Sequence, residues 1–185
     1  SVKNARELEQ IVVGDMSAIE KGLTVIGSQI PINASTKLDI LCHDENGTLV
    51  IFQLSTEEDD AMLFEALKGL SYLDTAKHMM KFYYSNFKIN DAETPRLVLL
   101  APSFSKNLLT IASHLTGLRI DLYEWEYLKF GDQKGLRIKP ISPGTLAAAR
   151  AQDRRAWKEQ PSEKPVSTVS SVEAPEKKED KEQAK

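Results

Sequence analysis

The chain has 185 residues, of which 41% are hydrophobic and 28% are charged, and its formal net charge is −3. This size and composition predict one sizeable folded core. The slightly acidic balance excludes a protein that binds nucleic acid indiscriminately, while a local basic groove stays open. The single cysteine, Cys42, excludes an internal disulfide and a cysteine-cluster metal site. No apolar run approaches the roughly 20 residues that span a bilayer, so we expect a soluble cytoplasmic protein without membrane contact.

The first residues predict a short helix followed by a strand. Apolar residues recur at helical spacing from residue 4 to residue 13, and Gly14 ends this pattern. Residues 23–32 are rich in valine and isoleucine, which is typical of a β-strand, and Gly27 within them predicts a bulge or bend.

Residues 37–55 predict a β-hairpin, because two apolar runs flank the turn sequence Asp-Glu-Asn-Gly at 44–47. A three-residue loop with Gly47 in the left-handed conformation fixes the register of the two strands. Directly opposed residues project to the same side of a sheet. We therefore expect one polar cluster that consists of Lys37, Asp39, Gln53 and Ser55.

The next residues alternate between helical and strand patterns. Residues 62–82 carry one long apolar stripe at helical spacing, and the run RLVLLA at 96–101 is typical of a strand buried on both faces. A helix at 105–115 and a strand at 118–127 follow, which predicts a parallel crossover, and 136–141 suits an edge strand. The expected fold class is α/β, with a mixed central sheet flanked by helices.

The C-terminal residues change in composition. We expect an α/β domain at 1–141, a basic helix within 142–160 that carries Arg150, and a disordered tail or linker at 161–185, where large apolar residues are almost absent. Such a tail is a candidate tether to a protein partner.

The amino-acid sequences of several of these segments also resemble those of the PD-(D/E)XK nuclease superfamily. Within it the chain looks most like the branched-DNA and mismatch endonucleases related to RecB-type nuclease domains. The likeness covers roughly residues 5 to 128 and implies a restriction-endonuclease-like fold. The matching residues are Leu8-Glu9, Gly22-Leu23, Gln29, Leu38-Asp39-Ile40-Leu41, Asp44-Glu45-Asn46-Gly47 and Leu49-Val50-Ile51.

The resemblance also implies a site. In that family a helix acid, the hairpin Asp and the Glu of a Glu-x-Lys triplet hold Mg²⁺ or Mn²⁺, and the Lys assists the attacking water. Glu9 matches the helix acid and Asp39 the hairpin Asp, whereas Gln53-Leu54-Ser55 stands in place of Glu-x-Lys. The implied metal ligands are therefore Glu9, Asp39 and Gln53.

The difference between Gln53-Leu54-Ser55 and the Glu-x-Lys triplet of the family decides which function we expect. Gln53 can offer a neutral carbonyl ligand, but Ser55 cannot replace a lysine ammonium. Lys37, opposite Ser55 in the expected register, is the candidate for a displaced catalytic lysine, and Asp39, Gln53 and Lys37 would then carry catalysis. For contacts with nucleic-acid phosphates the candidates are Lys37, Lys68 and Arg150.

Structural alternatives stay open beside these roles. Asp39 is either a metal ligand or a hydrogen-bonded polar remnant, Glu9 suits a solvated helix face, and Ser55 suits the N-cap of the long helix. We expect residues 79–84, rich in Met, Phe and Tyr, to be core and helix end. The leading expectation is a nuclease-like domain with impaired or lost catalysis that binds DNA or serves as an interaction module. The alternatives are an active metal-dependent endonuclease and a protein-interaction domain, including a homodimer.

Overall fold

The computed structural model describes residues 2, 4–33, 36–130, 133–142 and 144–146. The expected basic helix with Arg150 and the expected tail at 161–185 lie outside the described residues, apart from residues 142 and 144–146. The elements are α1 (Ala5–Gly14), the 3-10 helix η1 (Met16–Ala18), β1 (Thr24–Pro31), β2 (Lys37–His43), β3 (Leu49–Leu54), α2 (Ala61–Tyr83), β4 (Arg96–Ala101), α3 (Lys106–His114), β5 (Ile120–Phe130) and β6 (Gln133–Pro140).

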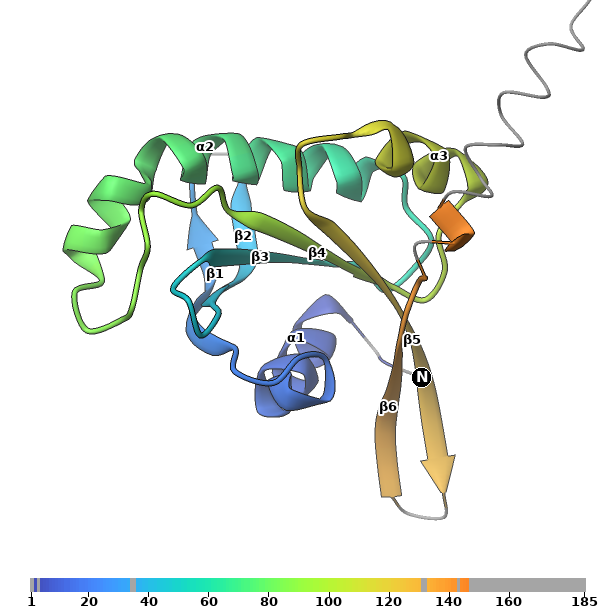
Figure 1. The fold of residues 1–185 in the computed structure, drawn as a ribbon. Coiled ribbons are helices and arrows are strands. Elements are labelled where there is room, and N and C mark those ends of the chain that lie inside the picture. Colours follow the sequence, from blue (N-terminus) through green and yellow to red (C-terminus); the bar gives the residue numbers. More distant parts are fainter. Residues whose placement is uncertain (1, 3, 34–35, 131–132, 143, 147–185) are drawn as a thin grey trace, which may run out of the picture.

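The six strands form one mixed sheet in the order β1-β2-β3-β4-β5-β6 (Figure 1). β3, β4 and β5 are parallel to one another, and the other neighbouring pairs are antiparallel. α2 connects β3 to β4, and α3 connects β4 to β5, so each parallel step is a helical crossover. The α/β class with an antiparallel hairpin and a parallel crossover is therefore confirmed.

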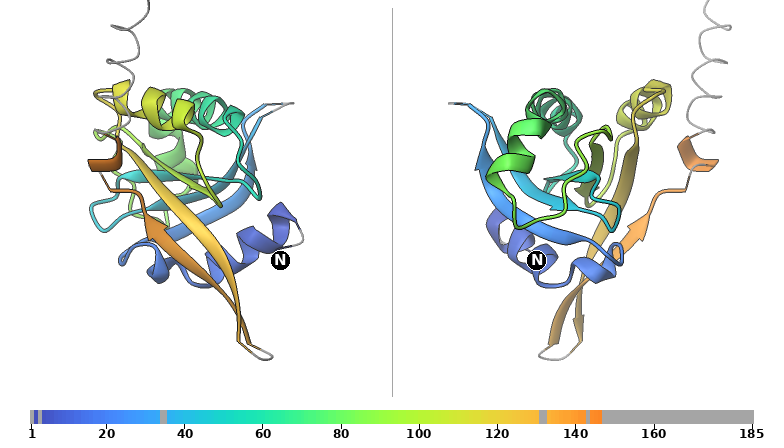
Figure 2. Two further views of the ribbon diagram at one scale, coloured as in Figure 1. Left: turned by 90° about the vertical axis from the view of Figure 1, so that its right-hand side faces the viewer. Right: turned by 60° about the vertical axis from the view of Figure 1, so that its left-hand side comes forward.

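Helices cover both faces of the sheet. α2 and α3 lie on one face and α1 on the other (Figure 1). The core on the α2 side joins strand residues such as Leu41 and Leu99 to α2, and the core on the α1 side joins Ile40 and Phe52 to Leu8 of α1. All six residues of β4 are buried, as the run RLVLLA predicts. The end of β5 and the start of β6 extend beyond these layers as a two-stranded ribbon (Figure 2).

The predicted hairpin register is confirmed from the turn to the pair Ile40–Phe52, but the ladder does not include the expected pairs of Asp39 with Gln53 and of Lys37 with Ser55. His43 pairs with Leu49, the backbone N–H of Asp44 donates to the carbonyl oxygen of Thr48 at 3.0 Å, and Gly47 has a φ of 85°. The bulge expected at Gly27 is present as a register shift between β1 and β2.

The prediction that Ser55 caps α2 is wrong. The backbone N–H of Ser55 donates to the carbonyl oxygen of Leu100 at 2.9 Å, so Ser55 still belongs to the β3–β4 ladder. Its hydroxyl bonds instead to the carbonyl oxygen of Glu57 at 2.7 Å. Because the chain first has to leave the sheet, α2 begins only at Ala61, after the N-cap position Asp60.

The prediction that residues 79–84 belong to the core is only partly correct. Met80 and Tyr84 pack against the core on the α2 side, but Met79, Phe82 and Tyr83 are exposed. By the helical period, Met79 and Phe82 lie opposite the buried residues of α2, whereas Tyr83 lines a groove together with the end of β1. None of the helices within the described residues has the length and apolar content needed to cross a membrane.

Candidate functional site

Asp39 lies where β2 and β3 stop pairing. The last residue pair of their ladder is Ile40 with Phe52. One residue farther along, the Asp39 carboxylate accepts a hydrogen bond from the backbone N–H of Leu54, with 2.8 Å between Oδ2 and N. The side chain of Asp39 thus provides the acceptor that a strand carbonyl would otherwise give to Leu54.

The side-chain alternation of β2 shifts by one residue at Asp39. Leu38 packs in the core on the α2 side, whereas Ile40, two residues on, packs in the core on the α1 side. Residues two apart in a regular strand share one face. On the neighbouring strand β1, Ser28 pairs with Ile40 and Ile30 pairs with Leu38, so Gln29 lies opposite Asp39. The φ of Gln29 is 52°, in the left-handed region. The two irregular positions, Gln29 and Asp39, therefore lie side by side.

This irregularity borders a pocket of about 550 Å³ beside the N-terminal half of α1. Glu9 and Arg6 reach it from one side of α1, since residues three apart are neighbours on a helix surface. β1 and β2 supply the rest of the wall. The lining residues are Asn4, Ala5, Arg6, Glu9, Ser28, Gln29, Lys37 and Asp39.

Gln29 connects the charged groups of this pocket. The Lys37 ammonium donates to Oε1 of Gln29, and Nε2 of Gln29 donates to the Glu9 carboxylate. Glu9 is only 8% exposed, so the expectation of a solvated helix face is wrong for this residue. From the sequence, Gln29 was named only as a match to the nuclease superfamily, without a role, and Arg6 was not named. A polar residue in the strand beside Asp39 was the signal for Gln29, and a cation one turn before Glu9 was the signal for Arg6.

The surroundings of Asp39 in the pocket shift the pKa of its carboxyl. Burial raises the pKa of the Asp39 carboxyl above its ordinary value. The hydrogen bond from Leu54 and the charge of Lys37 act in the opposite direction, and the nearby Glu9 carboxylate raises the pKa further. The pocket therefore holds two interacting carboxylates together with two cationic side chains.

Three of the predicted site residues meet in this pocket, and the others do not. Glu9, Lys37 and Asp39 line it, whereas Gln53 and Ser55 are not among its lining residues. Lys68 lies on α2, where its ammonium is 2.7 Å from the Glu65 carboxylate and 5.3 Å from the centre of the Phe64 ring. Arg150 lies outside the described residues.

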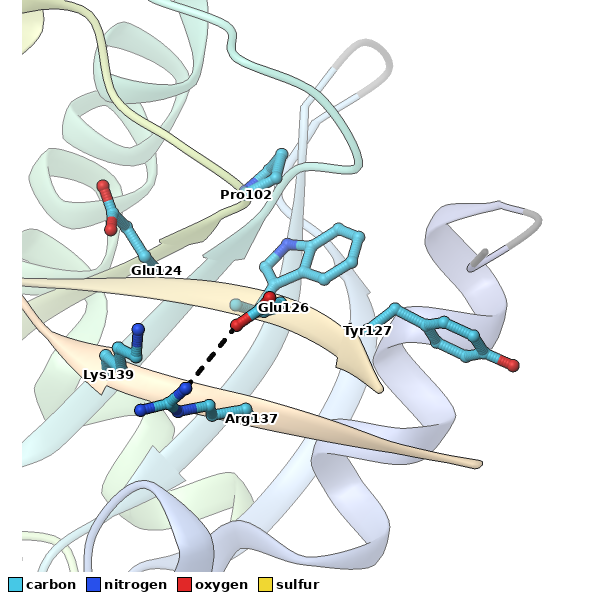
Figure 3. A pocket seen from close by; sticks show the side chains of 7 residues that line it. Pro102, Glu124, Glu126, Tyr127, Arg137 and Lys139 are labelled. Carbon is cyan, nitrogen blue, oxygen red and sulfur yellow. Dashed lines mark ion pairs between the residues drawn. The ribbon is translucent and has the colours of Figure 1, made fainter. Parts of the chain in front are cut away.

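A second pocket, of about 470 Å³, lies along the β5–β6 ribbon. Figure 3 shows Arg137 and Glu126 facing each other across the two strands, with 3.9 Å between Nη1 and Oε2. Glu124 and Lys139 are likewise cross-strand partners. The indole of Trp125 donates to the carbonyl oxygen of Ser55 at 2.9 Å, which ties the ribbon to the end of β3. Two acidic and two basic side chains line this pocket, so its charges balance.

No protein-family model matches the chain, and no curated protein matches it. Among solved structures, a repair endonuclease from Pyrococcus abyssi is similar over 64% of this chain and 46% of its own length, with 19% identity and a TM-score of 0.47. EndoMS in a complex with double-stranded DNA is similar over 64% of this chain and 44% of its own, with 19% identity and a TM-score of 0.39.

A protein of unknown function from Silicibacter pomeroyi is similar over 82% of this chain and 89% of its own, with 11% identity and a TM-score of 0.32. The chain thus spans less than half the length of the two endonuclease structures. At TM-scores below 0.5, these likenesses carry no function over to this chain.

Proposed function

We propose that the chain is a nuclease-like domain that binds nucleic acid and whose metal-dependent cleavage is impaired or lost. One observation carries the proposal: Glu9 and Asp39 share a pocket with Lys37, while positions 53 and 55 hold a glutamine and a serine. This arrangement supports a nuclease-like site in which the helix acid and the hairpin Asp are present and the Glu-x-Lys triplet has neither its carboxylate nor its ammonium.

The residues present do not fit a complete Mg²⁺ or Mn²⁺ centre. Such ions prefer several carboxylate and carbonyl oxygens around them. Within the described residues, no group of three or more His, Cys, Asp or Glu side chains could hold a metal ion. Moreover, the Gln29 amide already donates to Glu9, and the Leu54 N–H already donates to Asp39. We therefore derive no metal-dependent step.

Binding of nucleic acid would depend on the two cations of the pocket. Arg6 and Lys37 lie at the pocket beside the carboxylates, and phosphate contacts from such side chains weaken with rising salt. Fluorescence anisotropy with branched, single-stranded and duplex DNA at low salt tests this. We expect Arg6→Gln and Lys37→Gln each to weaken binding, and Lys139→Gln on the ribbon to serve as the control. Absence of binding by the wild type at low salt would favour a protein-interaction domain.

A second candidate function is active cleavage with a displaced lysine. The observation that favours it is that Lys37, although it bonds to Gln29, lines the same pocket as Asp39 and Glu9. Incubation of the same DNAs with Mg²⁺ or Mn²⁺ distinguishes the two functions. Metal-dependent cutting that both Asp39→Ala and Lys37→Gln abolish would establish the active enzyme and overturn the proposal of impaired catalysis.

A further inference from the structure

The outer face of α2 carries an apolar stripe that no described residue covers. The inner face of the helix packs on the sheet through Met62, Leu63, Ala66, Leu70 and Leu73. On the outer face, five large side chains are 46% to 81% exposed. At about 100° per residue they fall within about 100° of the helix circumference, so they form one stripe. We call it the outer stripe; it consists of Phe64, Tyr72, Met79, Phe82 and Tyr83.

The outer stripe is large enough for a stable protein contact. It runs almost the whole length of α2, whose 23 residues span about 34 Å. Its four aromatic side chains alone leave on the order of 500 Å² accessible, at about 200 Å² per ring residue. Two copies of such a stripe, with Met79 included, therefore reach the roughly 1,000 Å² that separates specific interfaces from incidental contacts.

An apolar groove of about 420 Å³ continues the stripe at its C-terminal half. Tyr72 and Tyr83 belong to both the stripe and the groove. The opposite wall of the groove comes from the end of the edge strand β1, through Ile30, Pro31 and the following Ile32. The C-terminal end of the stripe therefore has a recess that can receive an aromatic side chain.

Two residues of the stripe, Phe64 and Tyr83, are related by symmetry about a point between Leu73 and Asp74. In an antiparallel pair centred there, Phe64 of one helix lies opposite Tyr83 of the other, while Tyr72, Met79 and Phe82 lie opposite Thr75, Lys68 and Glu65. Phe64 at one end of each helix thus meets the partner's Tyr83 beside the groove. We propose that α2 packs antiparallel against α2 of a second copy of this chain, about a two-fold axis at this point. A two-fold contact requires such a self-complementary surface.

The charges at the two ends of α2 favour the same arrangement. The exposed residues 57–60 before the helix are all acidic. At the other end lie Lys77, Lys81 and Lys88, of which Lys77 and Lys81 also pair with Asp74 and Asp91. An antiparallel pair brings each acidic end near the partner's lysines, whereas a parallel pair would bring acid against acid. The same acidic segment disfavours nucleic acid as the occupant of the stripe.

Sedimentation equilibrium of the full chain over a wide concentration range tests the contact. We expect a monomer–dimer equilibrium that Phe64→Glu and Phe82→Glu each weaken by about tenfold or more, since buried aromatic side chains dominate such interfaces. Val13→Glu is the matched control: Val13 is also exposed and apolar, but it lies on α1 at the opposite face of the sheet. Far-UV circular dichroism of each variant checks that it folds. A wild type that stays monomeric throughout overturns the proposal, as does a dimer that both glutamate variants leave unchanged.

Disulfide cross-linking tests the antiparallel geometry. Cysteines at position 75 of two copies would lie about 5 Å apart along the helix axis, but cysteines at position 68 would lie about 16 Å apart. We therefore expect Thr75→Cys to cross-link rapidly on oxidation and Lys68→Cys to cross-link poorly. The native Cys42 is fully buried and does not interfere. Equal cross-linking at both positions would indicate parallel helices or random collision, and either result overturns the antiparallel pair.

Discussion

The carboxylate of Asp39 accepts a hydrogen bond from the backbone N–H of Leu54, with 2.8 Å between the two atoms. This contact joins β2 to β3 beyond the last pair of their ladder. It gives Asp39 a role in the fold that does not depend on any ligand. A functional test of Asp39 therefore has to separate the loss of a charge from the loss of an acceptor.

The pair Asp39→Asn and Asp39→Ala makes this separation. Asparagine retains a side-chain oxygen for the Leu54 N–H, whereas alanine leaves that N–H without an acceptor beside the buried Leu54 side chain. We expect Asp39→Ala to be less stable than Asp39→Asn by about 1–3 kcal/mol, the usual cost of an unsatisfied buried group. Urea unfolding of both variants measures the difference, and equal stabilities would show that the hydrogen bond does not stabilise the fold.

The raised pKa of Asp39 predicts a pH dependence with a definite sign. A carboxyl whose pKa is higher in the folded state than in the unfolded state holds its proton longer when folded. Its contribution to stability is therefore fully present below the ordinary value of 3.8 and is lost as the pH rises through the raised value. Asp39→Asn lacks this group, so its stability relative to the wild type should improve as the pH rises through that window. Urea unfolding at a series of pH values checks this, and an opposite trend would mean that the pKa is lowered.

The hairpin register was predictable because local chemistry determines it. The sequence Asp-Glu-Asn-Gly at 44–47 fixes the loop, and the loop fixes which residues pair. The position of Ser55 was not predictable in the same way. Its sequence suits a helix cap, but its N–H bonds to Leu100, which is 45 residues away in the sequence, and no local pattern reveals that partner.

The candidate site was predictable only in part, for a related reason. Glu9 and Asp39 followed from the family resemblance, and the structure places both in one pocket. The role of Gln29 depends on a left-handed backbone conformation at a residue that is not glycine, and on a shift in the alternation of two neighbouring strands. Neither feature has a local sequence signature, because each concerns how neighbouring strands pack together in the sheet.

The helical period of residues 62–82 predicted α2, but it did not predict that the outer face of this helix is exposed. Periodicity reveals which residues of a helix share a side, and the inner side is buried as expected. Phe82 and Tyr83 were expected in the core because they are apolar, yet they are 81% and 71% exposed. Whether an apolar stripe is buried within one chain or between two chains is not encoded in its period.

Cys42 should be inert in the folded protein. It is fully buried in the core on the α1 side, and burial raises the pKa of its thiol to about 12. Since the thiolate is the reactive species, only about 10⁻⁴ of the thiol would be ionised at pH 8. We expect an aromatic disulfide reagent to label Cys42 only as fast as the protein unfolds, and to label it at once in denaturant. Rapid labelling under native conditions would contradict this burial.

Arg96 should be the most costly charged side chain to remove. It is 1% exposed at the start of the central strand β4, and its guanidinium lies 2.6 Å from both carboxylate oxygens of Glu20 and 2.9 Å from Asp121. Its Nε has no hydrogen-bond partner among the residues that the structure describes. The carboxylates of Glu20 and Asp121 balance the charge of the guanidinium. Glu20 belongs to the segment between α1 and β1, and Arg96 thus fastens that segment to the sheet.

We expect Arg96→Ala to destabilise the fold by about 3–5 kcal/mol, because it leaves a void and two carboxylates without their cation. Glu20→Gln should cost less, since Asp121 still compensates the guanidinium. Arg96→Lys should lie between them, because one ammonium cannot reproduce the forked contacts. Thermal and urea unfolding measure all three variants.

Arg96 pairs with Val50 at the start of β3, whereas Asp39 contacts Leu54 at its end. The folded Arg96→Lys variant should therefore bind DNA as the wild type does, and a selective loss of DNA binding by that variant would place Arg96 in the site instead.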